Sequence, residues 1–171
     1  TNMPGKGSRH DLWAEAEGDM NPGARVEVLR ELHLDRYDID IGVLTGGPYT
    51  AAAHANPDYA AAYCSAFNDW TADTWIKEDS RLRGSIHIAP QDPHLAVEEI
   101  NRLGPDPRFV QVMIPAGARM PFGNRHYHPI YEACVRHKLP VSCHFGAEGA
   151  GITSPPTAAG YPTYYLEMRM A

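Results

Sequence analysis

Four short runs of apolar and β-branched residues recur along the chain, and segments with helical patterns separate them. The runs are 39–44 (IDIGVL), 82–89 (LRGSIHIA), 108–114 (RFVQVMI) and 139–145 (LPVSCHF). Runs of this length and composition predict strands. Two strands joined through a helix run parallel, because a hairpin leaves no room for the helix. The sequence therefore predicts an α/β fold made of parallel (β/α) units.

The segments between these runs carry helix signals. Apolar residues at helical spacing predict an amphipathic helix over 26–35. Asn56-Pro57-Asp58 offers a start for a long helix over 58–77, and Asp92-Pro93 offers one for 94–103, which ends at a glycine. A further helix, PIYEACVRHK, begins at His128-Pro129.

Two architectures have this alternation, an open doubly wound sheet and a (β/α)8 barrel. No GxGxxG follows a strand and no GxxxxGK[ST] occurs, so neither nucleotide-binding motif supports the open sheet. A complete barrel takes about 250 residues. With 171 residues we expect a single domain over 1–171 that forms part of a barrel.

Composition narrows the class of partner. The net charge is −6, from 15 Lys and Arg against 21 Asp and Glu, and no basic cluster alternates with aromatic residues, so we do not expect nucleic acid binding. No apolar run approaches the roughly 20 residues that span a membrane, and the first residues lack a secretory signal. Three irregularly spaced cysteines are typical of reduced thiols, so we expect a cytoplasmic protein.

His144 stands where the last predicted strand gives way to the glycine-rich loop 146–151. In parallel α/β proteins this end of a strand often carries the chemistry. Side chains alternate along a strand, so Ser142 and His144 share one face while Cys143 faces the other way, which argues against a Cys–His nucleophile pair. From the residues alone, His144 is a metal ligand, a base or a structural histidine.

Two other residues are candidates for contact with a substrate. Arg119 follows the third run, where its guanidinium would bind a carboxylate or form an ion pair within the loop. His54 lies in the loop after Gly46-Gly47, on the same side of the predicted sheet. The backbone amides of 146–151 are a possible anion site, and Glu148 is a possible acid or base that no spacing supports.

The remaining histidines are better explained by structure. His87 lies within a predicted strand and reaches the inner face, where we expect a buried histidine with satisfied hydrogen bonds. His126-Tyr127-His128 contains an H-x-H pattern, but it precedes Pro129 at a helix start, so the two rings need not converge on a metal.

The chain resembles a known family from about Pro22 to its end. The resemblance is carried by the order and spacing of LHLDRYDIDIGVL, SIHIAPQDPHLAVEEI, DPRFVQVMIPAGARMPFG, HPIYEACVRHKLPVSCHFGAEG and TAAGYPTYYLE. These blocks resemble the amidohydrolase-related, metal-dependent (β/α)8 barrels that include aminocarboxymuconate-semialdehyde decarboxylase. The match covers roughly strands two to five of such a barrel.

This resemblance implies one divalent metal, usually zinc, at the C-terminal mouth of the barrel. It places His144 at the fifth-strand ligand position, with the first-strand ligand pair before Thr1 and a catalytic His and an Asp after Ala171. It implies hydrolysis or decarboxylation of a small carboxylate-bearing or carbonyl substrate by an enzyme of which this chain is a part. We also expect a homo-oligomer.

A second hypothesis belongs to a different class, a catalytically silent α/β fragment. Four strands of a barrel leave two open edges and an apolar inner face, which favour self-association or binding of a partner. An upstream strand ending in His-x-His or Asp-x-His would favour the enzyme, and a stop codon after Ala171 would favour the silent fragment.

Overall fold

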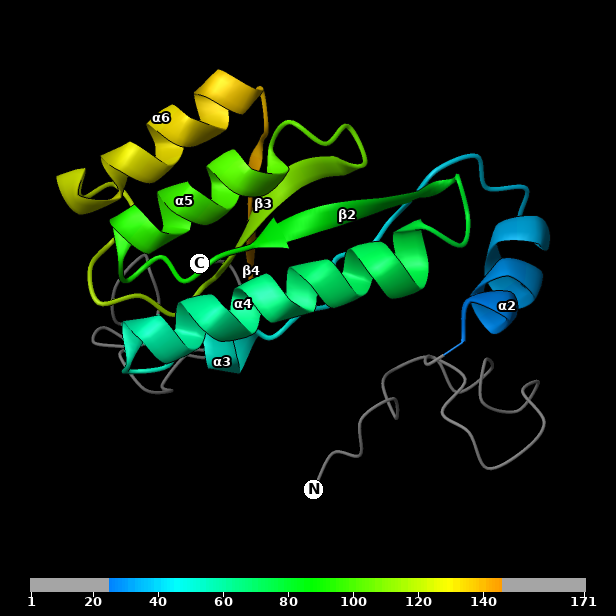
Figure 1. Cartoon of the computed structure of the whole chain (residues 1–171), viewed down its shortest axis with the longest axis horizontal. Coiled ribbons are helices and arrows are strands. Elements are labelled where there is room, and N and C mark those ends of the chain that lie inside the picture. The colour runs from blue at the N-terminus through cyan, green and yellow to red at the C-terminus, as the bar shows by residue number, and fades with distance from the viewer. Residues whose placement is uncertain (1–24, 146–171) are drawn as a thin grey trace, which may run out of the picture.

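The computed structural model describes residues 25–145, which form a sheet with helices on one of its faces (Figure 1). The elements in chain order are α2 (Val26–Leu29), η2 (Arg30–Asp35), β1 (Gly42–Val43), α3 (Tyr49–Ala52), α4 (Pro57–Thr71), η3 (Ala72–Ile76), β2 (Leu82–His87), α5 (Pro93–Leu103), β3 (Phe109–Pro115), η4 (Arg125–Tyr127), α6 (His128–His137) and β4 (Val141–His144). The wider turns η2 and η3 continue α2 and α4, and the 3-10 turn η4 leads into α6.

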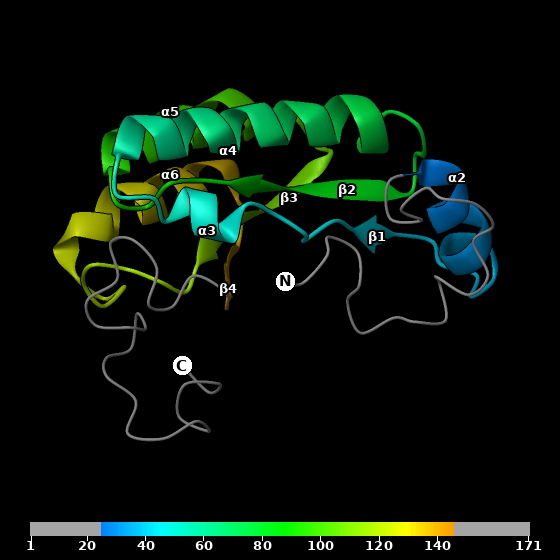
Figure 2. The same cartoon turned by 90° about the horizontal axis from the view of Figure 1, so that it is seen from below.

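The four strands form one parallel sheet whose spatial order, β1-β2-β3-β4, is their order in the chain. Leu82 pairs with Gly42, and Pro115 pairs with His144, so the register is fixed at both edges. The helices α4 and α5 lie on the same side of the sheet, and Figure 2 shows them above β1 and β2, with α3 close to the level of β1. The α/β fold with parallel (β/α) units is therefore confirmed, and the described part forms half of a TIM barrel.

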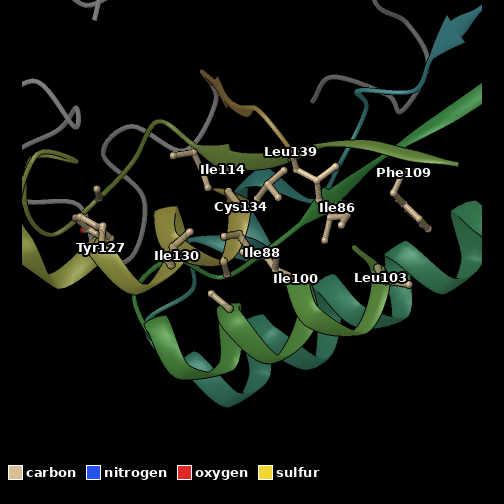
Figure 3. Packing of buried hydrophobic residues seen from close by; sticks show 14 of the residues in the cluster. Ile86, Ile88, Ile100, Leu103, Phe109, Ile114, Tyr127, Ile130, Cys134 and Leu139 are labelled. Atoms are coloured by element: carbon tan, nitrogen blue, oxygen red, sulfur yellow. The ribbon is translucent and has the colours of Figure 1, made fainter. Parts of the chain in front are cut away.

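The hydrophobic core lies between the strands and the helices α5 and α6, and it includes Ile76 of η3 (Figure 3). Alternate strand residues such as Ile86 and Ile114 point into it and meet Ile100 of α5 and Ile130 of α6. All four are at most 3% exposed. Burial of such aliphatic side chains, at roughly 2 kcal/mol each, is the main force that holds the helices on the sheet.

Local sequence explains where the helices begin. Asn56 precedes α4, and its Oδ1 accepts a hydrogen bond from Tyr59 N at 3.1 Å, while Pro57 supplies a first residue with no amide to satisfy. Asp92 precedes α5 and accepts from the amides of His94 and Leu95. Both predicted starts are confirmed.

Two details differ from the sequence predictions. The first strand is shorter than 39–44, because β1 pairs only over Gly42–Val43 and Ile41 and Val43 are 59% and 43% exposed. The stretch expected to be a loop after Gly46-Gly47 contains the short helix α3. Since α3 contacts β3, this segment folds back across the strand ends.

Charged groups gather where β2 begins. The carboxylate of Asp79 has a side-chain exposure of only 7%, and it accepts hydrogen bonds from Arg30 Nε at 2.9 Å and Arg81 Nη2 at 2.8 Å. Arg81 also pairs with Asp35 at 2.8 Å. These contacts join the α2–η2 segment to the start of β2 and support a small second core of Val26, Leu34, Trp75 and Leu82.

Candidate functional site

The carboxyl ends of the parallel strands meet at one edge of the sheet, where the connections after β1, β2 and β3 also lie. His144 ends β4 at this edge, opposite Pro115 of β3. Loops at this end of a parallel sheet carry the active sites of barrel enzymes. The residues at this edge are therefore the first candidates for function.

A chain of hydrogen bonds crosses the face of the sheet opposite the helices. Ser142 Oγ donates to Gln111 Oε1 at 2.7 Å, Gln111 Nε2 donates to Ser85 Oγ at 2.8 Å, and Ser85 Oγ donates to Leu44 O at 2.7 Å. Every strand or strand end thus contributes one partner. Because His144 lies two residues beyond Ser142, its side chain stands on this same inner face.

The alternation expected along β4 is present. Ser142 and His144 are half-buried, whereas Val141 and Cys143 are exposed. Cys143 lies close enough to Tyr131 of α6 to contribute to the raised pKa of that phenol, whose main cause is burial. Cys143 therefore lies on the helix side and forms no nucleophile pair with its neighbour His144.

The His144 imidazole is held between two aromatic rings. Tyr49 stacks on it at a centroid distance of 4.1 Å and an interplanar angle of 4°, and Phe145 stacks at 4.6 Å and 20°. Two parallel rings this close occupy opposite faces, since they would overlap on one. The His144 Nδ1 donates a hydrogen bond to the Phe145 carbonyl, because a carbonyl only accepts. In this tautomer Nε2 keeps its lone pair in the plane of the ring, which neither stacked ring covers.

His87 lies beside this pair and is 2% exposed. Its ring contacts Tyr49 at 5.7 Å and the edge of Phe67 at 5.2 Å, and it forms a hydrogen bond with the Gly46 backbone. Burial lowers the pKa of His87 to about 4, and the nearby His144 lowers it further. His87 is therefore neutral at neutral pH, and the expectation of a buried histidine with satisfied hydrogen bonds is confirmed.

Within residues 25–145, no contact is found between His144 and the other sequence candidates. Arg119 is exposed in the connection between β3 and η4, and no ion pair to it is found within residues 25–145. His54 is exposed after α3, where its Nδ1 accepts from Asn56 N at 3.1 Å and its ring packs on Tyr59. Glu148 and the loop 146–151 lie outside the described residues.

The H-x-H pattern forms no metal pair. His126 lies in η4, where its Nε2 is 3.3 Å from the Gln91 carbonyl, whereas His128 begins α6 and packs near Tyr131. The structural interpretation of this pattern is confirmed.

Sequence reasoning did not single out Tyr49. Its signal was weak, an aromatic residue two positions after the Gly46-Gly47 turn, and its significance comes from a contact with β4 that local patterns do not encode.

Among the side chains described around this site, His144 is the one suited to bind a metal ion. Among the described residues no hydrogen bond to His144 Nε2 is found, so its in-plane lone pair suits metal binding, and the other ring nitrogen is fixed by a carbonyl. Within residues 25–145, no three His, Cys, Asp or Glu side chains come together in a way that could hold a metal ion. His144 therefore fits as one ligand of a set that the described residues do not complete.

Two surface hollows among the described residues are not lined by His144. One lies between α4 and α5 and includes Cys64, Ser65 and Glu99, and the other lies along the outer face of α6.

Among the described helices, none has both the length and the apolar character that crossing a membrane requires.

Solved structures similar to this chain include decarboxylases. A 2,6-dihydroxybenzoate decarboxylase from Rhizobium aligns with a TM-score of 0.64 and 19% identity over 78% of this chain and 45% of its own. A 5-carboxyvanillate decarboxylase from Sphingomonas paucimobilis aligns with a TM-score of 0.57 and 25% identity over 67% of this chain and 34% of its own. A dihydroxybenzoic acid decarboxylase from Polaromonas sp. JS666, with bound manganese and the inhibitor 2-nitroresorcinol, aligns with a TM-score of 0.63 and 21% identity over 80% of this chain and 45% of its own. This chain thus spans less than half the length of each.

No curated protein matches the chain. A family model for amidohydrolases, however, matches residues 8–169, which is nearly the whole sequence. The parallel half-barrel, the strand-end histidine and this match agree with one another, and the chain belongs to the amidohydrolase family.

Proposed function

We propose that this chain is part of a metal-dependent hydrolase or decarboxylase that acts on a small carboxylate-bearing or carbonyl substrate, with His144 as one ligand of a divalent cation. The observation that carries the proposal is the His144 imidazole itself. It ends β4 on the inner face, its Nδ1 is held by a carbonyl, and no hydrogen bond to its Nε2 is found within residues 25–145. The family match and the decarboxylase neighbours support it.

The cation would supply Lewis-acid polarisation of a carbonyl or carboxylate oxygen. The chain's own residues would hold the cation and orient its ligand His144. Tyr49 and Phe145 limit rotation of the His144 ring, and the neutral ring of His87 adds no charge that would repel a cation. We propose zinc as the metal, although the Polaromonas neighbour contains manganese.

Two residues are proposed to contact the substrate. Arg119 is exposed in the connection that follows β3, so its guanidinium is available to pair with a carboxylate through two parallel hydrogen bonds. His54 lies at the same edge, since its carbonyl accepts a hydrogen bond from Gln91 in the connection after β2. Residues 1–171 are proposed to form one domain that is part of a barrel.

Metal analysis tests the proposal. The full-length enzyme of which this chain is proposed to be a part is purified without chelators, and its metal content per chain is measured by elemental analysis for the wild type, His144→Ala and the control His128→Ala, which removes an exposed histidine from α6. We expect near-stoichiometric metal in the wild type and the control, and its loss in His144→Ala. Equal metal content in all three proteins would remove His144 from the ligand set.

Release of carbon dioxide separates the two reactions. The metal-loaded protein is assayed with 2,6-dihydroxybenzoate and 5-carboxyvanillate, the acids after which two of the structural neighbours are named, and with simple amides and lactones. Carbon dioxide without hydrolysis would assign the decarboxylase branch, and the reverse would assign the hydrolase branch.

One observation favours the alternative, a silent fragment that self-associates. Apolar side chains are exposed at both edge strands of the described sheet, including Ile41 beside β1 and Phe145 after β4 at 59% and 73%. Exposed edges with apolar residues favour pairing between chains. Sedimentation of the metal-free protein tests this alternative, which predicts a dimer or larger assembly that contains no metal.

A further inference from the structure

The connection between β1 and α3 lies directly against the ring of His87. A Cβ atom added at Gly47 would lie 2.0 Å from His87 Cε1 and 2.5 Å from Nδ1, distances that atoms in contact do not adopt. The neighbouring residue Gly46 forms a backbone hydrogen bond with the same ring. The imidazole therefore fixes how closely this connection approaches β2, and only glycine fits at position 47.

His87 is itself held rigidly from the helix side. Asn68 of α4 is fully buried, its Nδ2 donates to the His87 carbonyl at 2.9 Å, and its Oδ1 accepts from the His87 amide at 2.9 Å. The Asn68 amide also donates to Glu99 of α5 at 2.7 Å. Two helices thus anchor the residue on which the connection rests.

Tyr49 follows Gly47 by two residues and reaches across to β4. Its ring stacks on His144, and its hydroxyl donates to the Thr45 carbonyl within the same connection. An unbroken series of contacts therefore runs from α4 through Asn68 and His87 to Tyr49 and His144.

We propose that His87, Gly47 and Tyr49 form a clamp that sets the plane of the His144 imidazole, with Tyr49 as a positioning residue that acts through His144. The purpose of this clamp rests on the proposed function. An imidazole binds a cation only along the in-plane lone pair of its nitrogen, so fixing the ring plane fixes the direction in which a ligand bond can form. The clamp uses stacking, which leaves that direction open.

The clamp predicts an NMR signature that needs no metal. Protons of a ring stacked on another aromatic ring are shifted upfield by its ring current, so the His144 ring protons, assigned with His144→Ala, should lie upfield of an exposed histidine such as His128. Tyr49→Leu and Gly47→Ala should each move them back toward ordinary positions, and Tyr49→Phe, which keeps the ring, should not. Tyr59→Leu, which removes an exposed aromatic residue from α4, is the matched control and should change nothing.

Should Gly47→Ala not fold by circular dichroism, His87→Asn takes its place, because it removes the imidazole that supports the connection without crowding Gly47. His144 signals that stay at their wild-type positions in Tyr49→Leu would overturn the stacking. Signals that stay there in Gly47→Ala or His87→Asn would overturn the role of His87.

Zinc affinity, measured by competition with a chromophoric chelator, separates failure of the clamp from failure of the proposed function. We expect Tyr49→Leu to bind Zn²⁺ about 10-fold more weakly than the wild type, as for loss of a group that orients a ligand. Tyr49→Phe, which keeps the ring, should bind Zn²⁺ with the affinity of the wild type. Equal affinity in the wild type and Tyr49→Leu would overturn the clamp and leave the function standing. No Zn²⁺ binding by any variant, with the NMR result as expected, would overturn the function and leave the clamp standing.

Discussion

The two ends of the sheet differ in how they use polar residues. Where β2 and β3 begin, carboxylates pair with arginines, Asp79 with Arg81 at 2.8 Å and Asp106 with Arg108 at 2.7 Å. Where the strands end, the rings of His87 and Tyr49, which are uncharged at neutral pH, lie beside His144.

The titration of these groups follows the same division. Hydrogen bonds from the Arg81 side chain hold the pKa of Asp79 well below its usual range, so its charge is stabilised. At the other end, burial lowers the pKa of His87 to about 4 and raises the pKa of Tyr49 to about 12, so both stay uncharged at neutral pH. In barrels the amino-terminal face of the strands contributes stability and the carboxyl-terminal face contributes function. We infer that the charged end is scaffold and the end with neutral rings is the site.

The largest expected effect on stability belongs to the charged end. Asp79→Ala leaves Arg30 and Arg81 without their shared, nearly buried partner, so we expect a loss of about 2 kcal/mol in the free energy of unfolding. Asp69→Ala, which removes an exposed partner of Arg102, is the control and should cost at most about 0.5 kcal/mol. Urea unfolding checks both, and equal losses would contradict the scaffold role of Asp79.

The same carboxylate predicts how stability depends on pH. The pKa of Asp79 is lower in the folded chain than in the unfolded chain, where it is about 3.9, so its stabilisation is present above that value and is lost as the pH falls toward the folded pKa. Stability should therefore fall as the pH drops below about 5, and less steeply in Asp79→Asn, in which Asp106 still contributes. Urea midpoints measured across this range would contradict the account if the two slopes were equal.

An intermediate effect is expected between the two ends. Gln111→Leu breaks the chain of hydrogen bonds across the inner face, because it removes the acceptor of Ser142 Oγ and one of the two partners of Ser85 Oγ, so we expect a loss of about 1 kcal/mol. Thermal unfolding with its calorimetric enthalpy checks this. A neutral or stabilising result would mean that water replaces the amide, and the inner face would then be wet rather than tied together.

The smallest effect on stability is expected at Arg119. Its exposed side chain makes no ion pair within residues 25–145, so Arg119→Ala should change the free energy of unfolding by less than about 0.5 kcal/mol. Its proposed partner is a substrate carboxylate, so KM for an acidic substrate should rise in Arg119→Ala and stay unchanged in the control Arg125→Ala. A large loss of stability in Arg119→Ala would place it in the scaffold.

Much of the fold could be predicted from sequence because it depends on local patterns. Strands β2 to β4 and helices α4 to α6 follow from β-branched runs, the caps Asn56 and Asp92, and apolar spacing. The face on which His144 lies follows from alternation along one strand. The first strand was predicted too long, because exposed Ile41 and Val43 look like strand core in sequence, and the helix α3 was not predicted.

The partners of each site residue could not be predicted. Tyr49, His87 and His144 come from helix α3 and two strands, and they meet only because the parallel register brings the strand ends together. The shared carboxylate of Asp79 depends in the same way on Arg30, which is far away in sequence. Periodicity predicts which face a residue occupies but not which distant residue it meets there.

The most direct test of the central claim is the zinc-induced change in melting temperature of the full-length chain, compared between the two ends of the sheet. A ligand that binds only the folded state raises the melting temperature. We predict that Asp79→Asn melts at a lower temperature but keeps the increase produced by Zn²⁺, whereas His144→Ala melts close to the wild type and loses that increase. An increase that survives in His144→Ala, or that disappears in Asp79→Asn, would contradict the division of the molecule into a charged scaffold end and a metal-binding end.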